Sequence, residues 1–311
     1  MIQDIAPHKF KNHYDPNKVP AEQSYVLNFS GEHGEEILVH SPENGGYSLP
    51  NVQDLSKAEY NEHSDRMHND DTDVAARIRN KLIYLFSVDD QDYFLLPDGV
   101  LSHPDFIRKS LRELRTSLHD TKLNHFIEVT AFQLNRWYQD NRFCGTCGNK
   151  TELDQTERAI RCPHCGRIIY PRIAPAVIVG VINRDRICLT KYAHGFDQYA
   201  LVAGFTEIGE TFEETVIREV KEEIGVNVKN IRYYKSQPWA ISDNILAGYF
   251  CEVDGDPTIH MDENELKSAA WYRPEEIVLQ SDDYSLTNEM MSLFKSGLFK
   301  IPESSTTDSP S

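Results

Sequence analysis

Residues 204–226 read Gly-Phe-Thr-Glu-Ile-Gly-Glu-Thr-Phe-Glu-Glu-Thr-Val-Ile-Arg-Glu-Val-Lys-Glu-Glu-Ile-Gly-Val and carry the strongest structural signal in the chain. Thr211, followed three residues later by Glu214, is a capping-box signature, which predicts a helix that starts near Phe212. Gly225 is placed to end this helix as a left-handed cap. The sequence therefore predicts a helix of about three and a half turns at this point.

One face of the predicted helix is acidic, and the neighbouring face is apolar. At about 100° per residue, Glu219, Glu222 and Glu223 fall at i, i+3 and i+4. The adjacent apolar stripe consists of Val216, Ile217, Val220 and Ile224. Crowded carboxylates repel one another, and a hard divalent cation removes that repulsion. The pattern indicates a helix that packs on the core and binds Mg²⁺ or Mn²⁺, with a solvated acidic face as the alternative.

A second strong signal lies upstream, in two Cys-x2-Cys pairs separated by fourteen residues. The four cysteines are Cys144, Cys147, Cys162 and Cys165, and a glycine follows each pair. This spacing predicts a four-thiolate zinc ribbon, in which the closed coordination shell makes Zn²⁺ structural. A module with two disulfides is the alternative. The remaining Cys188 and Cys251 lie in apolar runs and are expected to be buried.

Seven fixed residues within 204–226 resemble the Nudix box. They follow the spacing G-x5-E-x7-R-E-U-x-E-E-x-G-U, with Gly204, Glu210, Arg218, Glu219, Glu222, Glu223 and Gly225 in the fixed places. A motif of this length is far more specific than a lone glycine motif. The resemblance implies metal-assisted hydrolysis of a diphosphate linkage. It also implies that Glu210 is a further acid beside the metal ions and that Arg218 orients the acids as a salt-bridge partner.

Over about residues 110–275 the chain resembles the NADH pyrophosphatases, or NAD⁺ diphosphatases, of the Nudix superfamily. The order of ribbon, box and a Ser-Gln-Pro-Trp segment carries this resemblance. The segment then diverges from the family at residues 240–244, which read Ala-Ile-Ser-Asp-Asn. The resemblance implies that substrate is bound by Ser236, Gln237, Pro238, Trp239, Tyr170, Glu157 and Arg115.

The resemblance also implies a set of ligands for Mg²⁺ or Mn²⁺. Glu219 and Glu223 match the metal-binding glutamates of the family, and Glu222 completes the acidic cluster. The main-chain carbonyl of Ala203 and the downstream Glu265 match further ligands, with a shift to Glu263 left open.

The expected fold class is α+β, with a Nudix α/β/α sandwich domain preceded by a zinc ribbon and a smaller N-terminal α+β domain. We expect an N-terminal domain over 1–140, the ribbon over 141–170, the Nudix domain over 171–300 and a disordered tail over 301–311. The elements expected in the first domain are a strand at 37–40, a loop at 59–73, a hairpin formed by 81–88 and 93–96, and helices near 105–118 and 123–140. Those expected in the Nudix domain are strands at 176–182, 187–192, 200–203, 230–236 and 245–253 and a last helix near 285–294.

Composition limits the partners and the compartment. The formal net charge of −17 argues against broad affinity for nucleic acid or anionic membranes. An anionic substrate therefore needs a local positive site, which bound cations would supply. The sequence has no stretch of about twenty apolar residues and its N-terminus lacks the hydrophobic region of a signal peptide. We therefore expect a cytoplasmic protein with no membrane partner.

The sequence favours a hydrolase that cleaves the diphosphate of NAD(H) into nicotinamide mononucleotide and AMP. The resemblance implies that the same chemistry removes NAD caps from RNA in some family members, and that the protein forms a homodimer. Hydrolysis of ADP-ribose or other dinucleotides is one alternative, which the altered residues 240–244 support. A non-catalytic zinc-ribbon interaction module is the other.

Overall fold

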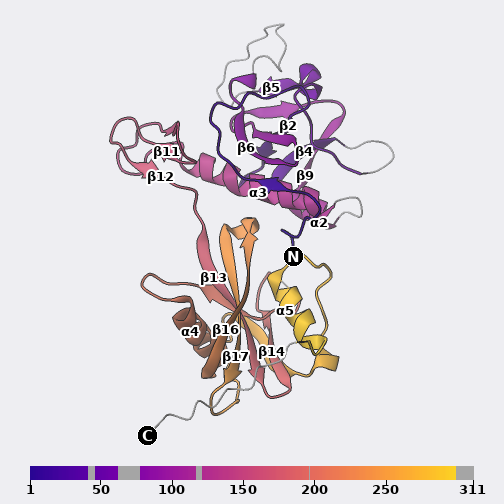
Figure 1. Ribbon diagram of the computed structural model, residues 1–311, viewed down its shortest axis with the longest axis vertical. Helices are drawn as coiled ribbons and strands as arrows, with labels where there is room; N and C mark the ends of the chain where they lie inside the picture. Colours follow the sequence, from indigo (N-terminus) through magenta and orange to yellow (C-terminus); the bar gives the residue numbers. More distant parts are fainter. Residues whose placement is uncertain (41–45, 62–77, 117–120, 196, 299–311) are drawn as a thin grey trace. The chain divides into compact units, whose positions relative to one another are not determined.

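A computed structural model describes residues 1–40, 46–61, 78–116, 121–195 and 197–298 (Figure 1). The chain divides into two compact units. The N-terminal unit holds residues 2–173 with 240–243, and the C-terminal unit holds Met1, 174–239 and the residues from 244 onward. The predicted disordered tail at 301–311 lies outside the described residues. The predicted boundary between ribbon and N-terminal domain at residue 140 stays a prediction.

The C-terminal unit is built on a mixed sheet that has six strands among the described residues. Its strands are β13 (Ala174–Asn183), β14 (Arg186–Tyr192), β15 (Val202–Phe205), β16 (Val228–Trp239), β17 (Asn244–Val253) and β18 (Leu266–Tyr272). Their order is β16-β17-β13-β14-β18, and β15 pairs with β13. The central pair β13 and β17 is parallel, and the other pairs are antiparallel. The sequence predicted each strand except β18.

The two faces of this sheet carry separate hydrophobic cores because side chains alternate along each strand. On β13, Val177, Val179 and Val181 face one core, while Ile178 and Ile182 face the other. Helix α4 (Phe212–Ile224) packs Val216, Val220 and Ile224 into the first core. Helix α5 (Leu286–Lys295) packs Leu286, Met290, Met291 and Phe294 into the second. The two helices lie on opposite sides of the sheet (Figure 1), which gives the predicted α/β/α sandwich.

Helix α4 begins and ends where the sequence predicts. The Thr211 side chain accepts from the backbone N–H of Glu214, and the Glu214 carboxylate accepts from the N–H of Thr211. Gly225 ends the helix at φ 74°, in the left-handed region where glycine is favoured. Both ends of the helix are therefore fixed by local interactions.

The N-terminal unit contains small sheets, the 3-10 helices η1 (Asp54–Lys57) and η2 (Ala240–Ser242), and longer α-helices. The sheets comprise β1 (Phe10–Lys11), β6 (Ile83–Val88), β7 (Gln91–Leu95) and β2 (Tyr25–Leu27); β3 (Phe29–Ser30), β4 (Glu36–His40) and β9 (Phe106–Ser110); and β5 (Glu59–Asn61) with β8 (Val100–Ser102). The longer helices include α2 (Leu111–Thr116) and α3 (Lys122–Asp140). A three-stranded ribbon follows, with β10 (Glu152–Leu153), β11 (Ile160–Arg161) and β12 (Ile168–Ile169). The hairpin β6–β7, the strand β4 and the helix α3 confirm the sequence prediction.

Two predictions for the N-terminal unit are wrong in part. The helix predicted near 105–118 is a strand over 106–110, where β9 pairs antiparallel with β4. Arg108 donates to the main-chain oxygen of Asn28 at 2.7 Å, so a tertiary contact also holds this segment extended. In the loop predicted at 59–73, residues 59–61 form a strand that pairs with β8, and the remainder lies outside the described residues. Long-range pairing outweighed local propensity at both places.

We predict that Thr211→Ala lowers the free energy of unfolding of the C-terminal unit by about 1 kcal/mol, because it removes a side-chain cap of α4. Thr211→Ser keeps the hydroxyl and is expected to unfold like the wild type. Urea denaturation followed by circular dichroism measures the difference. Equal midpoints for the Ala and Ser variants would contradict the role of this cap.

Candidate metal and hydrolase site

The guanidinium of Arg218 contacts three carboxylates of the site. Its Nε lies 2.6 Å from Glu210 Oε1, and its Nη1 lies 2.7 Å from Glu219 Oε1 and 2.9 Å from Glu222 Oε2. Its Nη2 donates to the main-chain oxygen of Phe205 at 2.9 Å. The hydrogen bonds from Arg218 lower the pKa of Glu210 to about 2. These contacts hold three acids around Arg218, while its orienting role in catalysis, which the family resemblance implies, stays a prediction.

Glu223 is the most buried acid of the cluster, with only 2% of its surface exposed. Its Oε1 accepts from the backbone N–H of Ala203 at 3.1 Å, while its Oε2 is buried and has no hydrogen-bond partner among the described residues. Burial raises the pKa of Glu223 to about 8, and the negative charges of Glu219 and Glu265 add to the shift. Burial also raises the pKa of Glu219, against the opposing effect of Arg218.

The glycine at position 204 is required by a close approach. A Cβ at Gly204 would lie 1.9 Å from the carboxyl carbon of Glu219, far inside any allowed contact. Strand β15, which contains Gly204, therefore passes directly against the acidic side of α4. This packing explains why a glycine stands at the first fixed position of the motif.

A pocket of about 480 Å³ opens beside this cluster. It is lined by Ala203, Gly204, Phe205, Glu207, Arg218, Glu219, Glu222, Asp262 and Glu265. The structure thus brings Glu265 to the same cavity as the acids of α4, although more than forty positions separate them in sequence. The alternative Glu263 is absent from the lining.

Sequence reasoning missed two acids of the pocket. Asp262 lines the pocket because its backbone N–H donates to the main-chain oxygen of Glu223 at 2.9 Å. This hydrogen bond holds the start of the acidic run 262–265 next to the end of α4. Glu207 lies in the loop before α4, where its N–H donates to Glu210 Oε2 at 3.0 Å. The acidic run itself was the available signal for Asp262.

The chemistry of these groups fits a divalent cation. Glu223 has a buried oxygen with no hydrogen-bond partner among the described residues. Burial raises the pKa of Glu219 although this carboxylate is paired with Arg218, and Glu265 lines the same pocket as Glu219. A hard cation binds such carboxylate oxygens and would compensate their burial. Glu219, Glu223, Glu265 and the main-chain oxygen of Ala203 are the groups that would hold it.

The four cysteines of the N-terminal unit form one compact cluster, and all four are free of disulfides. Their sulfurs lie within 4.8 Å of one another, with Cys144 Sγ 3.6 Å from Cys165 Sγ and Cys147 Sγ 3.5 Å from Cys162 Sγ. Zinc–sulfur bonds of about 2.3 Å in a tetrahedron place sulfurs roughly 3.8 Å apart. The cluster therefore suits a four-thiolate zinc ion and excludes the two-disulfide alternative.

The predicted substrate residues lie in several places. Tyr170 is 55% exposed and donates its hydroxyl to Glu157 Oε1 at 2.8 Å, both in the ribbon of the N-terminal unit. Arg115 lies in α2 of the same unit. In the C-terminal unit, Ser236 and Pro238 are exposed on β16, and Trp239 is half-buried against the core that α5 shares.

Gln237 has structural partners. Its side chain is 0% exposed, its Nε2 donates to the main-chain oxygen of Tyr284 at 2.7 Å, and its Oε1 accepts from the N–H of Leu286 at 2.6 Å. These bonds fix the start of α5. In this arrangement Gln237 does not face solvent, and its predicted contact with substrate stays a prediction.

Comparison with known proteins identifies two regions. Residues 172–294 match the NUDIX domain family. The chain carries a Nudix domain. Residues 139–170 match the NADH pyrophosphatase zinc ribbon domain, so the predicted order of ribbon and Nudix domain is confirmed.

Curated relatives match the same regions. The chain is 39% identical over 167 residues to the NAD-capped RNA hydrolase NudC of Vibrio atlanticus, covering 53% of this chain and 62% of the relative. It is 40% identical over 146 residues to the protein of that name from Pectobacterium carotovorum, covering 47% and 56%. The chain thus spans about three-fifths of the length of these relatives. A solved NUDIX hydrolase from Nitrosomonas europaea is 20% identical, covers 50% of this chain and 91% of its own, and has a TM-score of 0.43.

Among the described residues, no helix is both long and apolar enough to span a bilayer.

Burial of Glu223 predicts a pH-dependent stability in protein without added Mg²⁺ or Mn²⁺. The pKa of this carboxyl is about 8 in the folded chain, against an ordinary value of 4.5. Between these values the folded protein holds a proton that the unfolded chain has lost, so the free energy of unfolding falls as pH rises. Glu223→Gln removes this contribution. The melting temperature of the variant, compared with that of the wild type at the same pH, should therefore rise between about pH 5 and about pH 8. Scanning calorimetry measures both melting temperatures. A difference between variant and wild type that stays constant with pH would contradict the raised pKa of Glu223.

The cysteine cluster predicts about one zinc atom per chain in the purified protein, measurable by atomic emission. Cys144→Ser should lower the zinc content and destabilise the ribbon, because a thiolate ligand is lost. Cys188→Ala serves as a control, since Cys188 is a buried cysteine of β14 outside the cluster. Zinc retention that is equal in both variants would reject the site.

Proposed function

We propose that this protein hydrolyses the diphosphate of NAD(H) to nicotinamide mononucleotide and AMP, with Mg²⁺ or Mn²⁺ as the catalytic cofactor. The observation that carries the proposal is the convergence of Glu219 and Glu265 on one pocket beside the Arg218 ion pairs. The buried Glu223 lies next to this pocket, against the backbone of Ala203, and its charge interacts with those of Glu219 and Glu265. A pyrophosphatase-type ribbon and relatives called NAD-capped RNA hydrolases support NAD-type substrates.

The acidic residues and Arg218 of the Nudix domain have different proposed roles in the reaction. A divalent cation, when bound, supplies positive charge that stabilises a diphosphate under attack and lowers the pKa of water. Glu219, Glu223 and Glu265 would hold that cation, and Arg218 fixes the orientation of Glu219 through its short ion pair. Glu222 lines the pocket, is 61% exposed at its side chain and is paired with Arg218; it is the proposed acceptor of a proton from water.

Recognition of the two nucleotides is proposed for the predicted substrate residues. The exposed ring of Tyr170 offers a face for stacking, and Glu157 orients its hydroxyl. Trp239 and the exposed Ser236 and Pro238 provide a second group of contacts on β16. Arg115 is the proposed cationic contact. A substrate with an NAD moiety at the end of an RNA presents the same diphosphate, so removal of NAD caps follows from the same chemistry.

A side-by-side substrate panel tests the proposal. Turnover of NADH, NAD⁺, ADP-ribose, diadenosine polyphosphates and NAD-capped RNA is measured with Mg²⁺ and with Mn²⁺. We expect NADH or NAD⁺ to give the highest kcat/KM. A preference for ADP-ribose would favour the alternative suggested by residues 240–244, and no turnover with any substrate would favour a non-catalytic module.

Glu219→Gln and Glu223→Gln are each expected to lower kcat/KM by more than about 100-fold, because even partners outside a metal's first shell contribute up to that factor. Glu213→Gln is the matched control, since Glu213 lies exposed on the first turn of the same helix. Circular dichroism verifies that all three variants fold. Turnover by the Glu223 variant at the level of the control would remove Glu223 from the site.

A homodimer is also proposed, from the family resemblance, and a cytoplasmic location is proposed from the sequence features given above. Sedimentation equilibrium of the full chain measures the first, with a mass near twice 35.7 kDa expected. A monomer at micromolar concentration would contradict it.

A further inference from the structure

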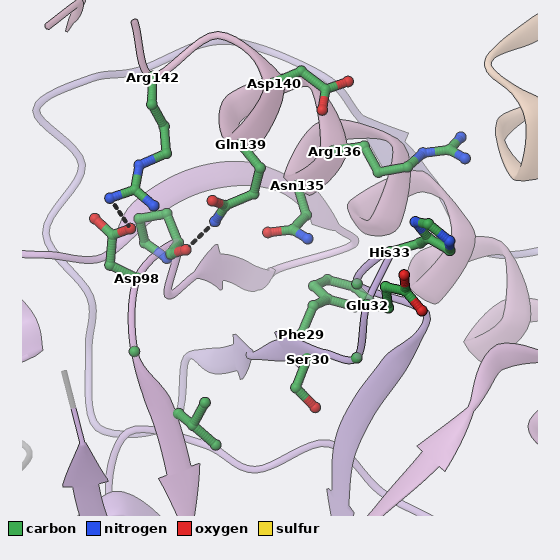
Figure 2. Close-up of a pocket in the computed structure, with 15 residues that line it drawn as sticks. Phe29, Ser30, Glu32, His33, Asp98, Asn135, Arg136, Gln139, Asp140 and Arg142 are labelled. Atoms are coloured by element: carbon green, nitrogen blue, oxygen red, sulfur yellow. Dashed lines mark hydrogen bonds and ion pairs between the residues drawn. The ribbon is translucent and has the colours of Figure 1, made fainter. Parts of the chain in front are cut away.

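A second pocket lies wholly within the N-terminal unit, and the proposed hydrolysis does not use it (Figure 2). Its volume is about 460 Å³, inside the range of about 300–1,000 Å³ usual for small-ligand sites. Its walls come from the last turns of α3, the turn 31–34 after β3, and the segment 97–100 before and into β8.

Hydrogen bonds hold these walls in place before any ligand arrives. Arg142 Nη2 lies 3.3 Å from Asp98 Oδ1, and Gln139 donates to the main-chain oxygen of Pro97, so two contacts tie the end of α3 and the residues just after it to the segment 97–100 (Figure 2). Behind this segment the buried Asn28 donates to the main-chain oxygen of Gly99 at 3.1 Å. The cavity is therefore largely preformed.

Asn135 is the unexplained group of the pocket. Its side chain points into the cavity from α3 and is only 4% exposed (Figure 2). In the part of the chain that the structure describes, its amide makes no hydrogen bond, and the amide atoms are not sealed off from the cavity that they line. A Cβ at Gly34 would lie 3.1 Å from Asn135 Nδ2, so the glycine leaves the amide uncovered. The amide therefore offers a donor and an acceptor to a ligand in the cavity.

The charges around Asn135 disfavour an anionic ligand. Arg142 is paired with Asp98, and Arg136 with Asp243 of the same unit. Glu32 and Asp140 also line the cavity, and neither makes an ion pair with another described residue. Among the described residues that line the cavity, a phosphate would meet two exposed carboxylates without ion pairs and two guanidinium groups that already pair with carboxylates. A neutral ligand with hydroxyl groups suits these acceptors.

We propose that this pocket binds an uncharged purine nucleoside of the adenosine type. The carboxamide of Asn135 offers one donor and one acceptor in a plane, which is the arrangement that pairs with N7 and the amino group of adenine. Glu32 and Asp140 accept hydrogen bonds from the ribose hydroxyls, as acidic residues do in dinucleotide folds. Phe29 supplies an aromatic wall.

Isothermal titration of the full zinc-loaded chain with adenosine, without added Mg²⁺ or Mn²⁺, tests the proposal. We expect saturable binding at one site per chain. Asn135→Ala should weaken binding about tenfold or more, since it removes both hydrogen bonds to the base. Asn124→Ala is the matched control, because Asn124 lies on the same helix and outside the pocket lining. Glu223→Gln should bind adenosine like the wild type, which separates this site from the Nudix pocket.

Several outcomes overturn the proposal: no saturable binding of adenosine, equal dissociation constants for Asn135→Ala and wild type, or loss of binding in Glu223→Gln. Ribose binding as tightly as adenosine would reject recognition of the base, and AMP binding more tightly than adenosine would reject an uncharged ligand. Unchanged melting temperatures of the Asn variants verify that each folds. NADH turnover by Asn135→Ala should equal that of the wild type, so this proposal and the proposed hydrolysis fail independently.

Discussion

Repulsion among carboxylates is the constraint on which the C-terminal unit depends. Three acids of one short helix and one acid of the preceding loop lie within reach of each other, and Arg218 offsets their repulsion by contacting Glu210, Glu219 and Glu222. The same guanidinium binds the main-chain oxygen of Phe205, which fastens the end of β15 to α4. The absence of a side chain at Gly204 allows that approach. Charge and close packing thus determine one arrangement together.

Arg218 leaves the deepest acid uncompensated. Glu223 has no contact with the guanidinium, and its one described hydrogen bond comes from the backbone N–H of Ala203. A protein selected only for stability would not bury such a carboxyl, because burial without a counter-charge is costly. Local conflict of this kind is expected at functional sites. The electrostatics of the pocket therefore point to a cation without any ion being present.

Local signals in the sequence predicted what local interactions determine. The capping box at Thr211 and Glu214, the cap at Gly225 and the cysteine spacing each act over a few residues, and each formed as expected. Strands β9 and β18 escaped prediction because their hydrogen bonds come from β4 and β14, far away in the chain. Asp262 and the buried contacts of Gln237 escaped for the same reason. Contacts between residues far apart in the chain decide which acids line a cavity, and short sequence motifs do not contain that information.

The contacts of Gln237 have a consequence for interpreting variants on β16. Because this side chain holds the first turn of α5, its replacement would loosen the layer that covers one face of the sheet. Catalysis would then decline through a damaged scaffold, even if the amide never meets a nucleotide. Diminished turnover at position 237 is thus ambiguous, whereas the exposed neighbours Ser236 and Pro238 report on recognition more directly.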